Sequence, residues 1–284
     1  MTIQEARRYG ASRLNTIYAA GEAGIISDWV IEHITGSKIT DRISAPKKEL
    51  TPEQASRQDQ YLERLLTHEP VQYVLGEAWF CGLKFRVDPN VLIPRPETEE
   101  LVEWVITNCK FPLSDLRILD IGTGSGCIAI SLKRRLGKAE VWACDLSTGA
   151  IALARENAQT LGADVHFAEL DFLSSAQRSA LPVFDIIISN PPYIPEKDKE
   201  QMQRNVLEYE PSMALFVPND DALLFYKAIA EFGKSHLQRE GNIYLEIHED
   251  LGEAVQQYFQ QTGYIAEIKK DMQEKDRMVR ARLK

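Results

Sequence analysis

The sequence predicts an α/β fold in which helices cover both faces of a largely parallel sheet whose last strand runs antiparallel. Three observations support this prediction. From about residue 117 onward, short apolar strands alternate with helical patterns. The last two strands are joined by too few residues for a helical crossover, so they should pair antiparallel. Before residue 70 the apolar residues recur at helical spacing, which indicates a separate small helical domain.

The helical domain is expected over residues 1–70. Its second helix should begin at Ser27, a residue type that caps helices. Its third helix has a stronger start signal. The Thr51 hydroxyl can accept from a backbone N–H in the first turn, Pro52 suits the first helical position, and the Gln54 side chain can reach back to the cap. We expect this domain to recognise the substrate.

A linker over residues 71–95 is expected next, and its aromatic and β-branched residues 79–87 predict a β-hairpin. The remaining residues, 96–284, should form the larger domain, which begins with a helix over 101–108. Strands are expected at 117–121, 140–144, 165–168, 184–189, 242–247, 264–268 and 278–283, and helices at 127–136, 148–161 and 223–236.

Composition argues against several classes of protein. The formal net charge is −9 and no run of basic residues stands out, so nucleic acid is disfavoured as a partner. Four scattered cysteines without a C-x-x-C pair predict neither a zinc site nor a disulfide scaffold. No apolar run is long enough for a membrane span and no signal peptide is visible, so a cytoplasmic protein without metal is expected.

A glycine-rich loop, Asp-Ile-Gly-Thr-Gly-Ser-Gly at residues 120–126, follows the first strand of the sheet and precedes a helix. Glycines let the backbone turn sharply and approach a ligand, and the helix start leaves N–H groups free. Asp145 ends the next strand about twenty residues further on, where a carboxylate can accept from both hydroxyls of a ribose. This context predicts a nucleotide-type site.

The ligand at this site is expected to be S-adenosylmethionine rather than a dinucleotide. The glycine spacing is G-x-G-x-G, and Asp120 beside the loop would repel a pyrophosphate but suit an amino group or a sulfonium. Asp120 could also serve only to cap the loop. The cofactor residues expected in or beside the loop are Asp120, Gly122, Thr123, Gly124, Ser125 and Gly126.

A second motif, Asn190-Pro191-Pro192-Tyr193, follows the fourth strand and should therefore lie beside the glycine loop. The Asn190 side-chain oxygen and the Pro191 carbonyl can accept both hydrogens of a substrate –NH₂, and Tyr193 offers a ring for a planar group to stack on. The lone pair of an amide nitrogen is delocalised. Two acceptors would orient this weak nucleophile in line with a sulfonium methyl. The pair of motifs predicts an N-methyltransferase in which Asn190 lies close to both cofactor and substrate.

The two motifs together resemble those of enzymes that methylate amino or amide nitrogens. Residues 69–76, 91–99 and 118–130 further resemble the HemK/PrmC family, the peptide chain release factor glutamine methyltransferases, and the resemblance covers the whole chain. It implies a Rossmann-like class I methyltransferase sheet and methylation of the glutamine in the Gly-Gly-Gln motif of release factors. It also implies that Phe172 lies against the adenine, although the family often carries Trp there.

Several alternatives remain open at this level. A glutamine methyltransferase of a ribosomal protein would share both motifs, and an N-methyltransferase of a nucleic-acid base could use the same acceptor pair. A binding module without turnover and an NAD-dependent dehydrogenase fit the motifs less well. Arg95 and Glu97 could support the site or lie in a solvated loop. The long stretch 194–219 is expected to close over the substrate.

Overall fold

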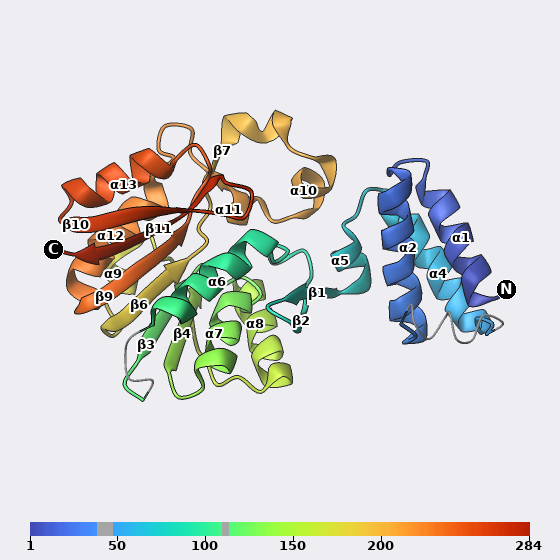
Figure 1. The fold of residues 1–284 in the computed structure, drawn as a ribbon, viewed down its shortest axis with the longest axis horizontal. Coiled ribbons are helices and arrows are strands. Elements are labelled where there is room, and N and C mark those ends of the chain that lie inside the picture. The colour runs from blue at the N-terminus through green and yellow to red at the C-terminus, as the bar shows by residue number, and fades with distance from the viewer. Residues whose placement is uncertain (39–47, 110–113) are drawn as a thin grey trace. The chain divides into compact units, whose positions relative to one another are not determined.

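The computed structural model describes residues 1–38, 48–109 and 114–284, and its largest element is a seven-stranded sheet (Figure 1). The strand order is β10-β11-β9-β6-β3-β4-β5. Five neighbouring strands run parallel to one another: β9, β6, β3, β4 and β5. The strand β11 is antiparallel to both of its neighbours, β9 and β10. The strands are β3 (Arg117–Ile121), β4 (Glu140–Asp145), β5 (His166–Glu169), β6 (Phe184–Ser189), β9 (Leu237–Glu246), β10 (Tyr264–Lys270) and β11 (Asp276–Leu283). The predicted fold class, including the antiparallel last strand, is confirmed.

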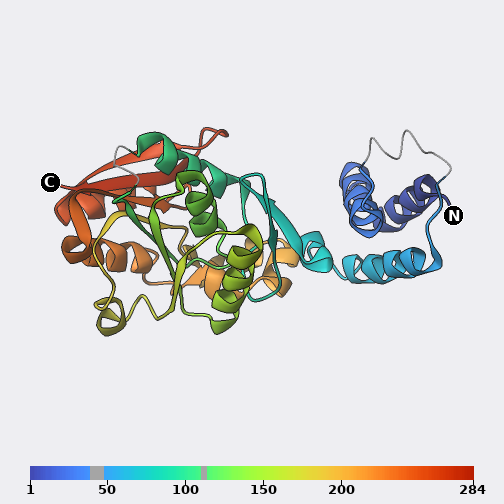
Figure 2. The same ribbon diagram turned by 90° about the horizontal axis from the view of Figure 1, so that it is seen from below.

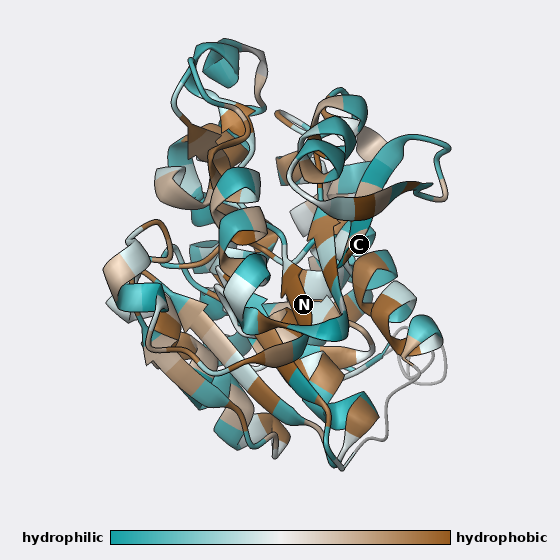
Figure 3. Cartoon of the chain, turned by 90° about the vertical axis from the view of Figure 1, so that its left-hand side faces the viewer, coloured by the Kyte–Doolittle hydropathy of each residue, from teal (hydrophilic) through white to brown (hydrophobic). Residues whose placement is uncertain are grey.

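The central strands are apolar on both sides because the sheet separates two hydrophobic cores. In β6, Ile186 and Ile188 face one core, and Ile187 between them faces the other, as the two-residue period of a strand requires. Figure 3 shows hydrophobic colour along much of the sheet and on parts of its covering helices. The first core is covered by α6 (Pro96–Asn108), α7 (Cys127–Leu136) and α8 (Thr148–Leu161), the second by α12 (Leu224–His236) and α13 (Gly252–Gln261).

The chain forms two compact units. One contains Met1–Glu77 together with Gln203–Tyr209, and the other contains the sheet, with Ala78–Met202 and Glu210–Lys284. In the helical unit, Tyr209 donates a hydrogen bond from its hydroxyl to the carbonyl of Thr67 (2.9 Å), which ties the inserted segment to that unit. Its helices are α1 (Ile3–Leu14), α2 (Ala20–Thr35), α4 (Pro52–Leu65), α5 (Val71–Leu75) and α10 (Arg204–Tyr209). The first three pack side by side (Figure 2).

Two helix starts in this unit test the expected caps. The capping box at Thr51 is present: its hydroxyl accepts from Gln54 N, and the Gln54 side chain accepts from Thr51 N. The prediction that Ser27 begins a helix is wrong, because α2 starts at Ala20. Ser27 lies inside α2, where its hydroxyl donates to the carbonyl of Arg7 on the neighbouring helix (2.8 Å).

The linker is only partly extended. Its first residues form the short helix α5, which the sequence analysis did not expect, and Gly76 ends it in the left-handed conformation. The expected hairpin follows as β1 (Glu77–Phe80) and β2 (Leu83–Arg86), with Gly82 at a positive φ of 73° in the turn.

The stretch 194–219 also holds more structure than its irregular pattern suggested. β7 (Ile194–Pro195) pairs in parallel with β8 (Phe216–Val217), so the two ends of the stretch lie together. Between them are a 3₁₀ turn at Glu196–Gln201, α10, and α11 (Ser212–Leu215). The remaining short helix, α9 (Ser175–Arg178), precedes β6.

Candidate active site

A cavity opens at the carboxyl ends of β3, β4 and β6, the edge where ligands bind in open α/β sheets. Both sequence motifs contribute to its walls. The predicted site residues that line it are Gly122, Thr123, Gly124, Ser125, Asp145, Phe172, Asn190, Pro191 and Pro192. Asp120, Gly126 and Tyr193 are not among its lining residues.

The glycine loop needs its glycines for their backbone conformation. Gly122, Gly124 and Gly126 have φ values of 71°, 54° and 81°, in the left-handed region that other residues rarely adopt. The loop is fastened to the end of β4, because the carbonyl of Cys144 accepts from the N–H groups of Gly122 (2.9 Å) and Thr123 (3.0 Å).

Asp120 lies beneath this loop, fully buried, rather than in the cavity wall. Its Oδ2 accepts from the Thr123 hydroxyl (2.6 Å) and from the N–H of Ala129 (3.2 Å). Its Oδ1 is buried without a hydrogen-bond partner among the described residues. Burial, and to a smaller extent the charge of Asp145, raises the pKa of Asp120 to about 7. In this structure Asp120 acts as the carboxylate that holds the loop to its helix.

Asp145 does line the cavity, and it joins two loops. One carboxylate oxygen accepts from Gly124 N and the other from Ser147 N, both at 2.9 Å. Burial raises its pKa, while those backbone hydrogen bonds oppose the rise. Each carboxylate oxygen can accept a second hydrogen bond, so Asp145 can still bind a pair of hydroxyls.

The apolar wall of the cavity includes Phe172, which is almost fully buried. Its ring makes an edge-to-face contact with Phe232, with centroids 5.2 Å apart. The guanidinium of Arg178 lies 5.5 Å from the ring centroid and donates to the Phe172 carbonyl (2.8 Å). Phe232 and Arg178, which hold Phe172, are not among the residues that line the cavity, so Phe172 can offer an apolar surface to a planar ligand.

Asn190 directly follows β6, and only the nitrogen of its side-chain amide has a hydrogen-bond partner among the described residues. Its Nδ2 donates to the hydroxyl of Thr98 (3.1 Å). Among the described residues, no hydrogen bond to its Oδ1 is found, so that atom remains for a ligand. Pro191 lacks an N–H, and it lines the cavity beside Asn190.

The side chain of Tyr193 differs from the sequence-based expectation. Its hydroxyl lies 3.4 Å from Glu246 Oε1, to which it donates, and its ring meets His248 edge-on. Burial raises its pKa, and the charge of Glu246 adds to the rise. In this arrangement the Tyr193 side chain contacts Glu246 and His248, and it does not line the cavity.

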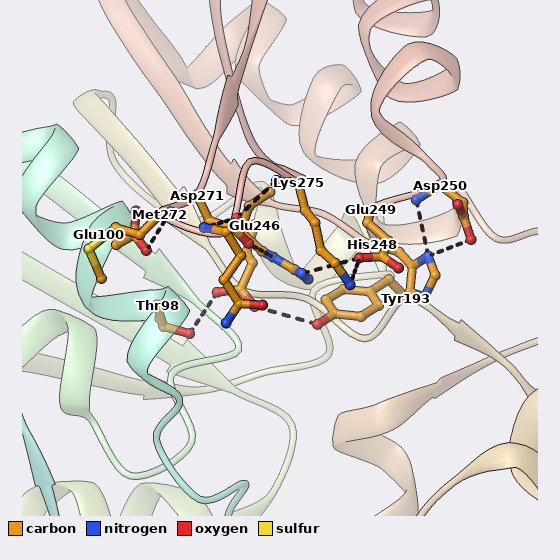
Figure 4. A network of polar contacts seen from close by, with 12 residues as sticks. Thr98, Glu100, Tyr193, Glu246, His248, Glu249, Asp250, Asp271, Met272 and Lys275 are labelled. Carbon is orange, nitrogen blue, oxygen red and sulfur yellow. Dashed lines mark hydrogen bonds and ion pairs between the residues drawn. The ribbon is translucent and has the colours of Figure 1, made fainter.

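Sequence reasoning missed Thr98 and Glu246. Thr98 lies near the start of α6 and lines the cavity, and its hydroxyl donates to Glu246 Oε2 (2.6 Å). Glu246 is the last residue of β9 and only 2% exposed. Figure 4 shows Thr98 and Tyr193 pointing toward Glu246 from different elements. Asp120 was predicted as a site residue because it is acidic and lies at the end of a buried strand. Glu246 has the same two features, so the sequence could have indicated it as well.

Arg95 also lines the cavity, and it is part of an ion pair. It contacts Glu210 Oε1 at 2.6 Å, while the other oxygen of Glu210 accepts from the N–H of Ile93 (3.1 Å). The side chain of Glu210 is 1% exposed, so this carboxylate is buried and fully paired. It joins the proline-rich approach to α6 to the residue that directly follows α10 in the stretch 194–219.

Two negative findings apply to residues 1–38, 48–109 and 114–284. Within these ranges no group of three or more His, Cys, Asp or Glu side chains could hold a metal ion. In the same part of the chain, no helix has both the length and the apolar character needed to cross a membrane.

Comparison with known proteins shows the family to which the chain belongs. A family model described as the PrmC N-terminal domain matches residues 5–76, and one described as the methyltransferase small domain matches residues 99–210. The release factor glutamine methyltransferase of Flavobacterium psychrophilum is 41% identical over 283 residues, covering 99% of each chain. The enzyme of the same name from Bacteroides thetaiotaomicron is 46% identical over 219 residues, or 77% of each chain.

Among solved structures, a methyltransferase from Pyrococcus furiosus resembles this chain with a TM-score of 0.51 at 18% identity, covering 78% of this chain and 97% of that one. At this identity the likeness concerns the fold alone.

Proposed function

Because the chain belongs to the family of release factor glutamine methyltransferases, we propose that it methylates the side-chain amide nitrogen of the glutamine in the Gly-Gly-Gln motif of peptide chain release factors, with S-adenosylmethionine as methyl donor. The observation that carries the proposal is the position of Asn190. It lines the same cavity as the glycine loop and keeps its Oδ1 without a partner among the described residues.

The residues of the cavity fit this cofactor. Asp145 has acceptor capacity left for ribose hydroxyls, Phe172 offers an apolar face for adenine, and the loop from Gly122 to Ser125 brings backbone close to the ligand. The unpartnered, buried Asp120 Oδ1 adds negative potential below that loop when it is ionised. S-adenosylmethionine, when bound, supplies an electrophilic methyl group on a sulfonium.

The part of Asn190 and Pro191 is to orient the nucleophile. The Asn190 Oδ1 and the Pro191 carbonyl would accept the two amide hydrogens of the substrate glutamine. A delocalised amide nitrogen gains little nucleophilicity from its surroundings, so the main contributions are alignment and stabilisation of positive charge that develops on that nitrogen. No titrating base is required until the methylated nitrogen sheds its extra proton.

The protein partner would be the release factor itself. The net charge of −9 can favour encounter with a basic protein surface, and it disfavours a phosphate backbone. The helical unit is proposed as the part that recognises the release factor. Because release factors act on ribosomes in the cytoplasm, the proposal includes a cytoplasmic location.

The test is methyl transfer from labelled S-adenosylmethionine to a purified bacterial release factor. A variant release factor with the Gly-Gly-Gln glutamine replaced serves as the control substrate. Label on the wild-type factor alone is expected. Label on both factors would move the target to another residue. Label on neither would refute the proposed substrate and direct the search to ribosomal proteins and nucleic acid.

A further inference from the structure

A buried chain of hydrogen bonds connects the amide of Asn190 to a carboxylate on the neighbouring strand. Asn190 Nδ2 donates to Thr98 Oγ1 (3.1 Å), and Thr98 Oγ1 donates to Glu246 Oε2 (2.6 Å). The register explains why the ends meet. Ser189 on β6 pairs with Leu245 on β9, so the next residue of each strand lies at the same level of the sheet.

The charge of Glu246 sets the direction of this chain. A carboxylate has only acceptors, so Thr98 must use its single hydroxyl hydrogen on Glu246. The Thr98 oxygen can then only accept from Asn190, which selects the amide orientation with Nδ2 toward Thr98. The other atom, Oδ1, is thereby left to accept from a donor in the cavity that Asn190 lines. A neutral side chain at position 246 would remove this constraint.

We propose that Glu246 is a positioning residue that fixes the acceptor orientation of Asn190 through Thr98. The inference rests on the proposed function for its catalytic consequence, but the orientation of the Asn190 amide is a property of the free protein. Glu246 also accepts from the Tyr193 hydroxyl, so one carboxylate orients two members of the Asn-Pro-Pro-Tyr motif.

The surroundings of Glu246 make its ionisation sensitive to pH. Burial raises the pKa of Glu246 to about 7, and the nearby charge of Glu97 on α6 adds to this. The hydrogen bonds from Thr98 and Tyr193 and the charge of Arg277 on β11 lower it.

From α12, the Tyr226 hydroxyl donates to the backbone carbonyl of Glu246. Below pH 7 a protonated Glu246 can donate to Thr98. Thr98 can then donate to Asn190 Oδ1 and favour the flipped amide.

Three variants separate this role from simple packing. Glu246→Gln keeps the shape but exposes an NH₂ group to one of the two hydroxyls. Thr98→Val keeps the volume and breaks the chain, whereas Thr98→Ser keeps the hydroxyl. Thr107→Val is the matched control, because it removes a hydroxyl from an exposed position on the same helix. Among the described residues, that hydroxyl is bonded only to α6 carbonyls and Asn108.

The first readout needs no substrate. The side-chain amide ¹H–¹⁵N signal of Asn190, assigned by its loss in Asn190→Ala, should shift with pH around a midpoint near 7 in the wild type. The shift should be absent in Glu246→Gln and Thr98→Val, and unchanged in Thr107→Val. An Asn190 signal with the same position and the same pH response in the wild type and in Glu246→Gln would overturn the proposal.

The second readout is methylation of a release factor at saturating cofactor. Turnover should fall about 10- to 100-fold in Glu246→Gln and Thr98→Val, with cofactor affinity retained, because misorientation of a positioning group acts on the chemical step. Thr98→Ser should recover most of the activity that Thr98→Val loses.

The proposed role would be contradicted if Glu246→Gln kept the turnover and the pH profile of the wild type. Equal losses of turnover in Thr98→Val and Thr98→Ser would also contradict it. A wild-type enzyme that leaves release factors unmethylated would refute only the substrate, since the amide signal tests the orientation independently.

Discussion

Replacing Gly126 by alanine should destabilise the sheet unit strongly. The loss should exceed that at a glycine where alanine introduces backbone strain but no close contact. Gly126 caps α7 at a φ of 81°. A Cβ there would lie 2.8 Å from Ile130 Cδ1 and 3.2 Å from Ala154 Cβ. The left-handed backbone costs about 1–2 kcal/mol for alanine. Overpacking against Ile130 and Ala154 adds about 1–3 kcal/mol. We expect a loss of about 2–5 kcal/mol in the free energy of unfolding, from those two contributions together.

Gly162→Ala is the matched control. Gly162 ends α8 in the left-handed conformation, with a φ of 62°, but the nearest atom to its Cβ would be Arg134 Nη1 at 3.7 Å, an ordinary contact. This variant should lose only about 1–2 kcal/mol. Urea unfolding followed by tryptophan fluorescence gives both values, and the cofactor dissociation constant should rise only in Gly126→Ala. Equal losses in the two variants would refute the packing argument.

Three further predictions concern the site. Asn190→Ala should lower turnover about 100-fold or more by removing a transition-state acceptor. Calorimetry should show cofactor affinity unchanged, and wild-type activity would remove Asn190 from the mechanism. Phe172→Ala should weaken cofactor binding by about 1–3 kcal/mol, a typical value for stacking a base on an aromatic ring; an unchanged dissociation constant would place the adenine elsewhere. Burial raises the pKa of Asp120 from 3.8 to about 7, so the folded state holds this proton more tightly than the unfolded chain. Relative to Asp120→Asn, the wild type should therefore lose stability as pH rises from about 4 to 7, by up to about 4 kcal/mol. Unfolding temperatures measured across this range check the difference, and parallel curves would contradict the buried position of Asp120.

The sheet could be predicted from the sequence because its central strands are short apolar runs between glycine and polar segments. The residues of β6 are an example, since both faces of this strand lie in a core. α13 was overlooked, although Val255 and Phe259 lie four residues apart on its buried face, a spacing typical of an amphipathic helix.

Ser27 was misjudged for a different reason. Its residue type is favoured at helix starts, but a serine inside a helix can also satisfy its hydroxyl on a neighbour. The carbonyl of Arg7 that accepts from it lies in another helix, and no local pattern reveals that contact. By contrast, the capping box formed by Thr2 and Glu5 at the start of α1 was visible in the sequence and was overlooked.

The two motifs could be expected to meet, because the carboxyl ends of parallel strands share one edge of a sheet. The contacts that orient the motif residues could not be predicted in the same way. The partners Thr98 and Glu246 are 148 residues apart in the chain. Likewise the direction of the Tyr193 side chain depends on Glu246 and His248, which only the folded sheet brings next to it.

The three adjacent strands β9, β6 and β3 end in one repeated arrangement. Asn190 follows the middle strand, and a buried carboxyl ends or nearly ends each neighbour: Glu246 on β9 and Asp120 on β3. Each carboxyl accepts a hydrogen bond of 2.6 Å from a threonine hydroxyl, Glu246 from Thr98 and Asp120 from Thr123. Burying these groups raises the pKa of both to about 7, which is unfavourable for the folded protein when they are ionised. Two neutral amides of the same shape would avoid that cost but would no longer dictate the direction of the hydroxyl hydrogens. The arrangement therefore gives up stability for a fixed orientation of the glycine loop on one side and of the Asn190 amide on the other. Such preorganisation is what the proposed function requires of these two groups.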